Sequence, residues 1–152
     1  MENEALKTRL SELLPTATFE EATEWPTMLI EPGDWLPLAQ QLRNDTALNF
    51  NYLFCLSCVD FKTHLTMVYH LTSTTFRHNI VIKAKLNTTT PEIETVSQIW
   101  RTAEFHEREV YELFGVQFLH HPDLRLLILP DGWEGKNPLR KDFEDPINMI
   151  KL

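Results

Sequence analysis

The chain has 152 residues, 43% of them hydrophobic and 24% charged, which predicts one compact domain with its own core rather than a disordered chain, a fibre or a disulfide scaffold. Its formal net charge of −8 would repel nucleic-acid phosphates and anionic lipid headgroups, so we expect no nucleic-acid partner. No apolar run approaches the roughly 18 residues that span a bilayer, and the acidic start, Met1 to Glu4, is unlike a secretory signal, which predicts a cytoplasmic location without membrane insertion.

The first half of the chain carries two helical patterns separated by a short strand pattern. A leucine stripe that ends at Pro15 predicts a first helix; it consists of Leu6, Leu10, Leu13 and Leu14. Residues 26–31 read as a strand. After the turn at residues 32–34, Asp34 is expected to cap a second helix, with an inward face of Trp35, Leu38, Ala39 and Leu42.

From residue 50 the apolar residues alternate with a period of two, which predicts strands. We expect three inward faces: Phe50, Tyr52, Phe54, Leu56 and Cys58, then Leu65, Met67, Tyr69 and Leu71, then Phe76, Ile80, Ile82, Ala84 and Leu86. These patterns predict an α+β fold, a largely antiparallel sheet with helices packed on one face.

Two further helices are expected after the strands. Thr90 would cap the first of them, with Pro91 in its first turn and a buried stripe of Ile93, Val96 and Trp100. The second runs from Ala103 to Phe114 and ends at Gly115, which suits a left-handed residue. We therefore assign residues 1–115 to an α+β domain.

Residues 116–152 contain four prolines and show neither a helical nor a strand period. The prolines are Pro122, Pro130, Pro138 and Pro146. Because long segments without regular elements are uncommon in compact domains, we interpret residues 116–152 as an extended C-terminal docking segment.

No group of residues predicts a catalytic, cofactor-binding or metal site. Cys55 and Cys58 have the spacing of a metal clip, but residues three apart on a strand point to opposite faces, so we interpret them as core residues. His120 and His121 are adjacent but lack the cysteine or carboxylate spacing of a metal site. The four glycines cannot form a dinucleotide or phosphate loop.

The predicted helix 103–114 carries many carboxylates. Glu104 and Glu112 each lie four residues from Arg108, which suggests an ion-paired helix face exposed to solvent. The alternative is that Arg108 and its neighbouring carboxylates meet the following loop or a partner protein.

Residues 104–143 resemble the 30-kDa subunit family of respiratory complex I, whose bacterial members are the C subunits of NADH:quinone oxidoreductase. The resemblance is carried by Phe105-His106-Glu107-Arg108-Glu109-Val110-Tyr111-Glu112-Leu113-Phe114-Gly115-Val116, then His121-Pro122-Asp123-Leu124-Arg125, Leu129-Pro130, Trp133 and Pro138-Leu139-Arg140-Lys141-Asp142-Phe143. The first hundred residues agree with this family in element order only.

The resemblance implies a subunit without a redox centre of its own, in the peripheral arm on the cytoplasmic side of the inner membrane. Its partners would be the large quinone-site subunit and the iron–sulfur subunits, with FMN, the clusters and quinone carried by other subunits. Within this role, Glu107, Arg108, Glu109 and Glu112 would brace the helix against the tail. Residues 122–125 and 138–142 would carry the docking surface.

Two alternatives remain open at this stage. The first is the equivalent subunit of a membrane-bound hydrogenase or of another complex I-like oxidoreductase. The second is a stand-alone protein-interaction domain that belongs to no redox assembly.

Overall fold

A computed structural model describes residues 2–147. Its elements, in chain order, are α1 (Asn3–Leu13), β1 (Thr18–Phe19), β2 (Thr27–Ile30), the 3-10 turn η1 (Pro32–Asp34), α2 (Trp35–Asn44), β3 (Tyr52–Asp60), β4 (Leu65–Thr72), β5 (Asn79–Leu86), β6 (Glu92–Glu94), α3 (Ala103–Phe114) and β7 (Gln117–Leu119). No helix among these residues is both long enough and apolar enough to cross a bilayer.

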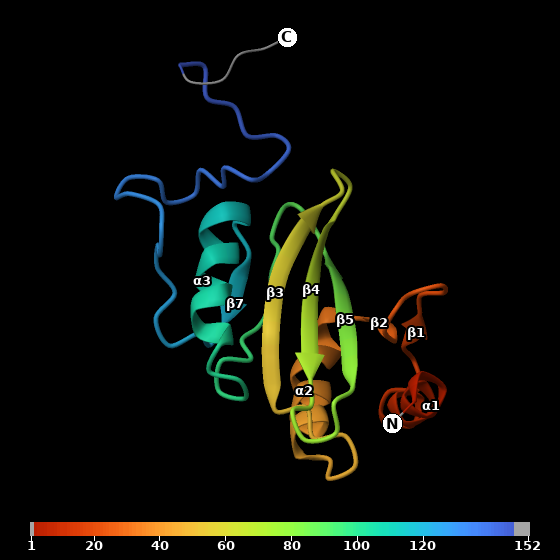
Figure 1. The fold of residues 1–152 in the computed structure, drawn as a ribbon. Coiled ribbons are helices and arrows are strands. Elements are labelled where there is room, and N and C mark those ends of the chain that lie inside the picture. The colour runs from red at the N-terminus through yellow and green to blue at the C-terminus, as the bar shows by residue number, and fades with distance from the viewer. Residues whose placement is uncertain (1, 148–152) are drawn as a thin grey trace.

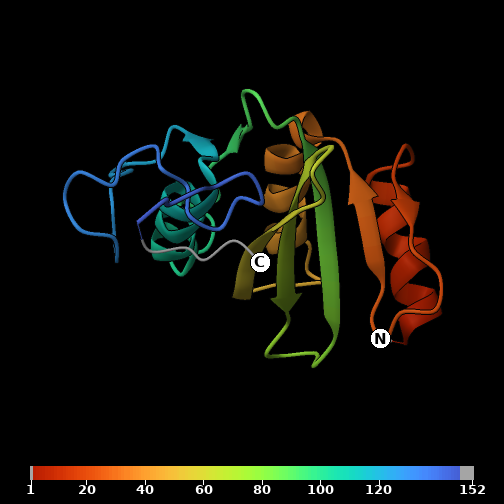
Figure 2. The ribbon, with the colours of Figure 1, turned by 90° about the horizontal axis from the view of Figure 1, so that it is seen from above.

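The expected α+β architecture with a mostly antiparallel sheet is confirmed. Five strands form one sheet in the order β1-β2-β5-β4-β3, in which only the β2–β5 pair is parallel. In Figures 1 and 2, α2 packs across one face of β3, β4 and β5. In both views α1 lies at the β1–β2 end of the sheet and α3 lies beside β3 at the other end. A second sheet consists of β6 and β7 alone, paired in parallel.

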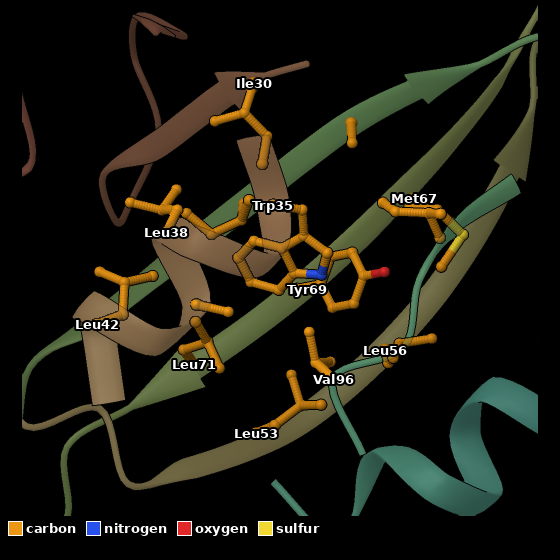
Figure 3. Close-up of a cluster of buried hydrophobic side chains, with 14 of the residues drawn as sticks. Ile30, Trp35, Leu38, Leu42, Leu53, Leu56, Met67, Tyr69, Leu71 and Val96 are labelled. Carbon is orange, nitrogen blue, oxygen red and sulfur yellow. The ribbon is translucent and has the colours of Figure 1, made fainter. Parts of the chain in front are cut away.

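The core is centred on Trp35, at the start of α2. The Trp35 ring lies 4.5 Å from the Tyr69 ring of β4 and stacks 6.1 Å from Trp100, measured between centroids. Figure 3 shows Trp35 and Tyr69 between α2 and the inward face of the sheet. The inward residues that we expected on α2, β4 and β5 are buried. They are Trp35, Leu38, Ala39 and Leu42 on α2, Leu65, Met67, Tyr69 and Leu71 on β4, and Ile80, Ile82, Ala84 and Leu86 on β5.

The inward face that we expected on β3 is partly wrong. A register shift between Leu53 and Cys55 inserts an extra residue against β4, and such a bulge reverses which side chains point inward. As a result Leu53 is buried while Tyr52 is 44% exposed. Phe76 is also wrong, because it lies in the turn before β5 and is 45% exposed.

The helix expected from Thr90 onward is wrong, since residues 92–94 form β6. The Thr90 N–H is bonded to the Asn87 side chain, and Ile93 pairs with Phe118 of β7. Local helix-start signals are outweighed here by pairing with a strand about 25 residues later. The burial expected for Ile93, Val96 and Trp100 is nevertheless correct.

Of the two residues expected to cap α2 and α3, one is confirmed. Asp34 lies in η1 and its side chain makes no capping bond to α2, so the expectation for this residue is wrong. Gly115, in contrast, ends α3 in the left-handed conformation with φ of +79°, as its position after Phe114 predicts. An added Cβ at Gly115 would lie 2.6 Å from Nδ2 of Asn137, so the tail packs closely over this turn.

Beyond β7, residues 120–147 form neither helix nor strand. The strand β7 itself lies within the segment that we expected to lack regular elements, and its residue Phe118 and the preceding Val116 are buried in the core. The folded domain therefore extends past residue 115.

We expect Gly115→Ala to lower the free energy of unfolding by about 1–2 kcal/mol, because an L-residue is strained at this φ. Gly33→Ala is the matched control, since a Cβ added at Gly33 would have no neighbour within 4 Å and should change stability by less than about 0.5 kcal/mol. Urea unfolding measures both variants. Equal stability of the two variants would contradict the tight turn at Gly115.

Candidate functional site

Three charged side chains of α3 are buried: Glu107, Arg108 and Glu112. A charged group is buried only where hydrogen bonds or counter-charges replace its water. The expected ion pairs of Arg108 with Glu104 and Glu112 do not form among the described residues. The partners of the three buried groups lie instead in the segments before and after α3.

Arg108 binds backbone carbonyl groups of the tail. Its Nε donates to the Arg125 carbonyl at 3.1 Å and its terminal nitrogen donates to the Leu126 carbonyl at 2.6 Å. The guanidinium also lies over the Phe105 ring, 5.5 Å from its centroid. The fixed fork of an arginine suits two neighbouring acceptors of this kind.

Glu112 binds the backbone N–H groups that follow. The Leu127 and Leu129 N–H groups donate to Oε2 of Glu112 at 2.8 and 3.1 Å, and the Ile128 N–H donates to both oxygens at 3.0 and 3.1 Å. Together with Arg108, one turn away on α3, it binds two carbonyl groups and three N–H groups of residues 125–129, a segment without a strand partner. Of the two interpretations of this helix face, the one that joins it to the following loop is correct.

A second set of contacts fixes the tail at the end of α3. The Arg140 Nε donates to the Phe114 carbonyl at 2.7 Å, where the helix leaves carbonyls unpaired. The Leu139 N–H donates to the Leu113 carbonyl at 3.0 Å. The Lys141 N–H donates to Asp60, at the end of β3, at 2.9 Å, and this bond lowers the pKa of the Asp60 carboxyl.

Glu107 lies between α3 and the residues after β6. Its oxygens accept hydrogen bonds from Thr95 Oγ1 and from the Val96 N–H, at 2.5 and 2.8 Å. Burial raises the pKa of this carboxyl to about 7, against the lowering effect of these two bonds. His121 lies nearby, with its Nε2 3.8 Å from Oε2 of Glu107.

The remaining motif residues lie more freely. Glu109 is half-buried and makes no hydrogen bond or ion pair within the described part of the chain. Asp123 and Arg125 form an ion pair of 2.9 Å on the surface, and Leu124 packs against the core. The Lys136 ammonium lies over the Trp133 ring, 4.6 Å from its centroid. Four others are exposed or half-exposed, without a side-chain contact that bears on the site: Pro122, Pro130, Pro138 and Asp142.

Cys55 and Cys58 are both free thiols. Cys58 is buried in the core, where burial raises its pKa to about 12, while Cys55 is half-buried on the outward side of β3. Within residues 2–147, no three His, Cys, Asp or Glu side chains gather as metal ligands would.

Sequence reasoning missed Thr95 and Asp60. Both bind the site through pairings that depend on β6 and on the end of β3, and nothing in their immediate sequence marks them. Asp60 lies beyond the alternating residues that end at Cys58, and Thr95 lies inside the expected helix that does not form.

We expect Glu112→Ala to cost about 2–3 kcal/mol of unfolding free energy, because it leaves three backbone N–H groups without their charged acceptor. The amides of residues 127–129 should then exchange much faster with solvent. Glu109→Ala, on the same helix, should leave both quantities nearly unchanged. Urea unfolding and hydrogen exchange of the isolated chain test this, and unchanged protection of residues 127–129 in the Glu112 variant would contradict it.

Comparison with known proteins places this geometry in a family. Residues 28–147 match the family of the respiratory-chain NADH dehydrogenase 30-kDa subunit. The C subunit of NADH-quinone oxidoreductase from Chlorobium phaeobacteroides is 38% identical over 119 residues, covering 76% of this chain and 71% of that protein. The corresponding C subunit from a Roseiflexus species is 34% identical over 147 residues, covering 93% and 84%.

Other relatives are longer than this chain. It spans 50% of the length of the C subunit from Chloroherpeton thalassium, at 39% identity over 78% of this chain. It spans 17% of the C/D subunit from Phocaeicola vulgatus, which is 47% identical over 58% of this chain.

Solved structures show the same fold. A trypsin-resistant fragment of Nqo5 superposes with a TM-score of 0.67 at 23% identity, covering 82% of this chain and 100% of the fragment. A chain of the membrane-bound sulfane sulfur reductase, an archaeal respiratory membrane complex, gives 0.78 at 26% identity, covering 93% and 85%. The helix that binds the backbone of its own tail thus occurs in a member of the 30-kDa subunit family of respiratory-chain NADH dehydrogenase.

Proposed function

We propose that the chain is the C subunit of a proton-translocating NADH:quinone oxidoreductase, in the peripheral arm on the cytoplasmic side of the membrane. It supports electron transfer from NADH to quinone without a redox centre of its own, while FMN, the iron–sulfur clusters and quinone belong to other subunits. Family membership and the names of the relatives support this proposal. A relative that is named as a C/D subunit supports the large quinone-site subunit as a partner.

One observation carries the structural role. Arg108 and Glu112 hold the backbone of the tail, and the side chain of Arg140 binds the end of α3, while several apolar side chains of the tail are exposed. We define the α3–tail surface as the exposed side chains Phe105, Leu127, Ile128 and Leu139. All four lie on α3 or on the segments bound to it. Exposed apolar side chains on an ordered backbone are suited to a permanent protein interface.

The iron–sulfur subunits are the second group of proposed partners. The acidic character of the whole chain, with a net charge of −8, favours partners with basic surfaces. The polar residues within 122–125 and 138–142 supply the polar rim of the α3–tail surface, including the exposed ion pair of Asp123 with Arg125.

A second candidate is the equivalent subunit of another complex I-like membrane complex. The high TM-score with a chain of the archaeal sulfane sulfur reductase favours it. NADH:quinone oxidoreductase activity of the complex purified through a tag on this chain separates the two. Activity with NADH supports the first candidate, and a complex that contains this chain but accepts electrons only from another donor supports the second.

We expect Ile128→Asp to reduce the amount of the chain that copurifies with its partner subunits at least about tenfold. Ile128 is 69% exposed, so the change buries no charge in the isolated chain but places one in the proposed interface. Phe76→Asp is the matched control, since Phe76 lies in the turn before β5, away from α3. If both variants assemble normally, the α3–tail surface is not the interface.

Arg108→Ala should reduce the amount of assembled complex severalfold while leaving turnover per assembled complex unchanged. Among the described residues, Arg108 donates to backbone carbonyls and lies against the Phe105 ring, so its loss disorders the surface rather than a reacting group. Quantifying the complex on native gels, together with activity per complex, tests this. Normal assembly with abolished turnover would assign Arg108 to the chemistry instead.

A further inference from the structure

A recess lies where the tail meets the turn between β3 and β4, and it has a volume of about 360 Å³. In Figure 1 the tail passes close to this end of β3, to which the Lys141 N–H is bonded. Three separate segments of the chain line the recess: Asp60, Lys62, Thr88, Arg140, Lys141 and Asp142. Three of these side chains are cationic and two are carboxylates, so the recess is basic although the whole chain carries a net charge of −8.

One buried carboxylate fixes the backbone of both lysines. Oδ1 of Asp60 accepts the Lys62 N–H at 2.7 Å, and Oδ2 accepts the Lys141 N–H at 2.9 Å. Lys62 has a left-handed conformation with φ of +69°, which residues other than glycine seldom adopt. Asp60 is only 7% exposed. The two lysines, which are far apart in the sequence, therefore meet at one position in the fold.

The charge of Arg140 is fixed beside them. Its Nε and Nη1 donate to the Phe114 and Thr88 carbonyls, at 2.7 and 2.9 Å. These oxygens satisfy the N–H groups of the guanidinium but carry no net charge. Among the described residues, Arg140, Lys62 and Lys141 form no ion pair.

The carboxylates of the recess do not balance its three cations. Asp60 offsets one positive charge, and both of its oxygens already accept backbone N–H groups. Asp142 is exposed to solvent, where water and salt weaken its attraction to a cation. An additional negative group in the recess would therefore be stabilised.

The recess adjoins the α3–tail surface. Leu139 belongs to that surface, is 55% exposed and directly precedes Arg140 and Lys141. A partner that covers Leu139 comes within reach of both cations. An apolar or basic partner would remove water from unpaired charges at a high cost, whereas an acidic side chain would replace that water with an ion pair.

We infer that the recess receives a Glu or Asp side chain of the partner subunit that covers the α3–tail surface. This inference rests on the proposed function, in which that surface is a permanent interface. The partner carboxylate pairs with Lys62 and Lys141. Because charges are screened beyond about 8 Å at physiological salt, the recess acts at contact distance. It fixes the position of the partner, while the acidic chain as a whole does not attract an acidic protein from afar.

Carbodiimide cross-linking of the complex purified through a tag on this chain tests the recess, because the reagent joins an amine to a carboxylate in contact with it. Mass spectrometry should find Lys62 or Lys141 joined to an Asp or Glu of a partner subunit. Acetylation of both lysines by an N-hydroxysuccinimide ester should be at least about fivefold slower in the complex than in the isolated chain. This test uses the native chain, so it does not depend on the folding of a variant.

Lys85 is the matched control for both reagents. It is exposed, forms no ion pair among the described residues and lies on β5, on the face of the sheet opposite to α2. Its acetylation should change by less than about twofold on assembly.

Charge reversal tests the same inference by assembly. Lys62→Glu combined with Lys141→Glu keeps both backbone bonds to Asp60 and should reduce the amount of complex on the order of tenfold. Lys85→Glu should leave that amount unchanged. The urea midpoint of each isolated variant shows whether the fold is retained.

Three outcomes of the cross-linking experiment decide. A cross-link to a partner carboxylate supports the inference. Lysines that react as fast in the complex as in the isolated chain would overturn the docking, and protection without a carboxylate cross-link would overturn the acidic partner. A complex with NADH:quinone oxidoreductase activity and reactive lysines contradicts only the recess. Cross-linked lysines in a complex without that activity contradict only the proposed function.

Discussion

The attachment of the tail to α3 is the constraint on which the C-terminal third of the molecule depends. A segment without helix or strand must still satisfy its backbone N–H and C=O groups wherever it packs. Arg108 and Glu112, one helical turn apart, provide donors and acceptors in the order in which residues 125–129 require them. Both charged side chains form hydrogen bonds with backbone groups of the tail, which explains why they are buried without forming an ion pair with each other.

The elements that could be predicted from the sequence are those specified by their own residues. The inward faces of α2, β4 and β5 follow from periodicity because each element buries one continuous face against Trp35 and its neighbours. The predictions are wrong where the local structure depends on pairing with a strand that is distant in the sequence. The bulge near Leu53 depends on the register with β4, and β6 exists because β7 pairs with it.

In the candidate site, too, the features set by neighbouring residues could be predicted and those set by distant partners could not. Arg108 and Glu112 contact the following loop, as one of the two interpretations of this helix expects, while Glu107 binds residues before the helix. The spacing of charges suggests ion pairs instead, because that argument considers the helix alone. The partners of Arg108 and Glu112 are backbone groups between 15 and 18 residues away. Backbone groups have no sequence signature, so only the fold identifies them.

The way in which the tail is held also decides what kind of surface the proposed docking segment offers. A disordered segment that folds on a partner loses conformational entropy at the moment of binding, which weakens its affinity. Here the backbone of residues 125–129 and 139–141 is already bound to α3 and to Asp60 in the isolated chain. Leu127 and Ile128 remain exposed on the outer side of the same backbone that Glu112 holds. In the proposed complex, a partner that covers them would meet a preorganised surface, and the buried charges of α3 would contribute to its affinity without contacting it.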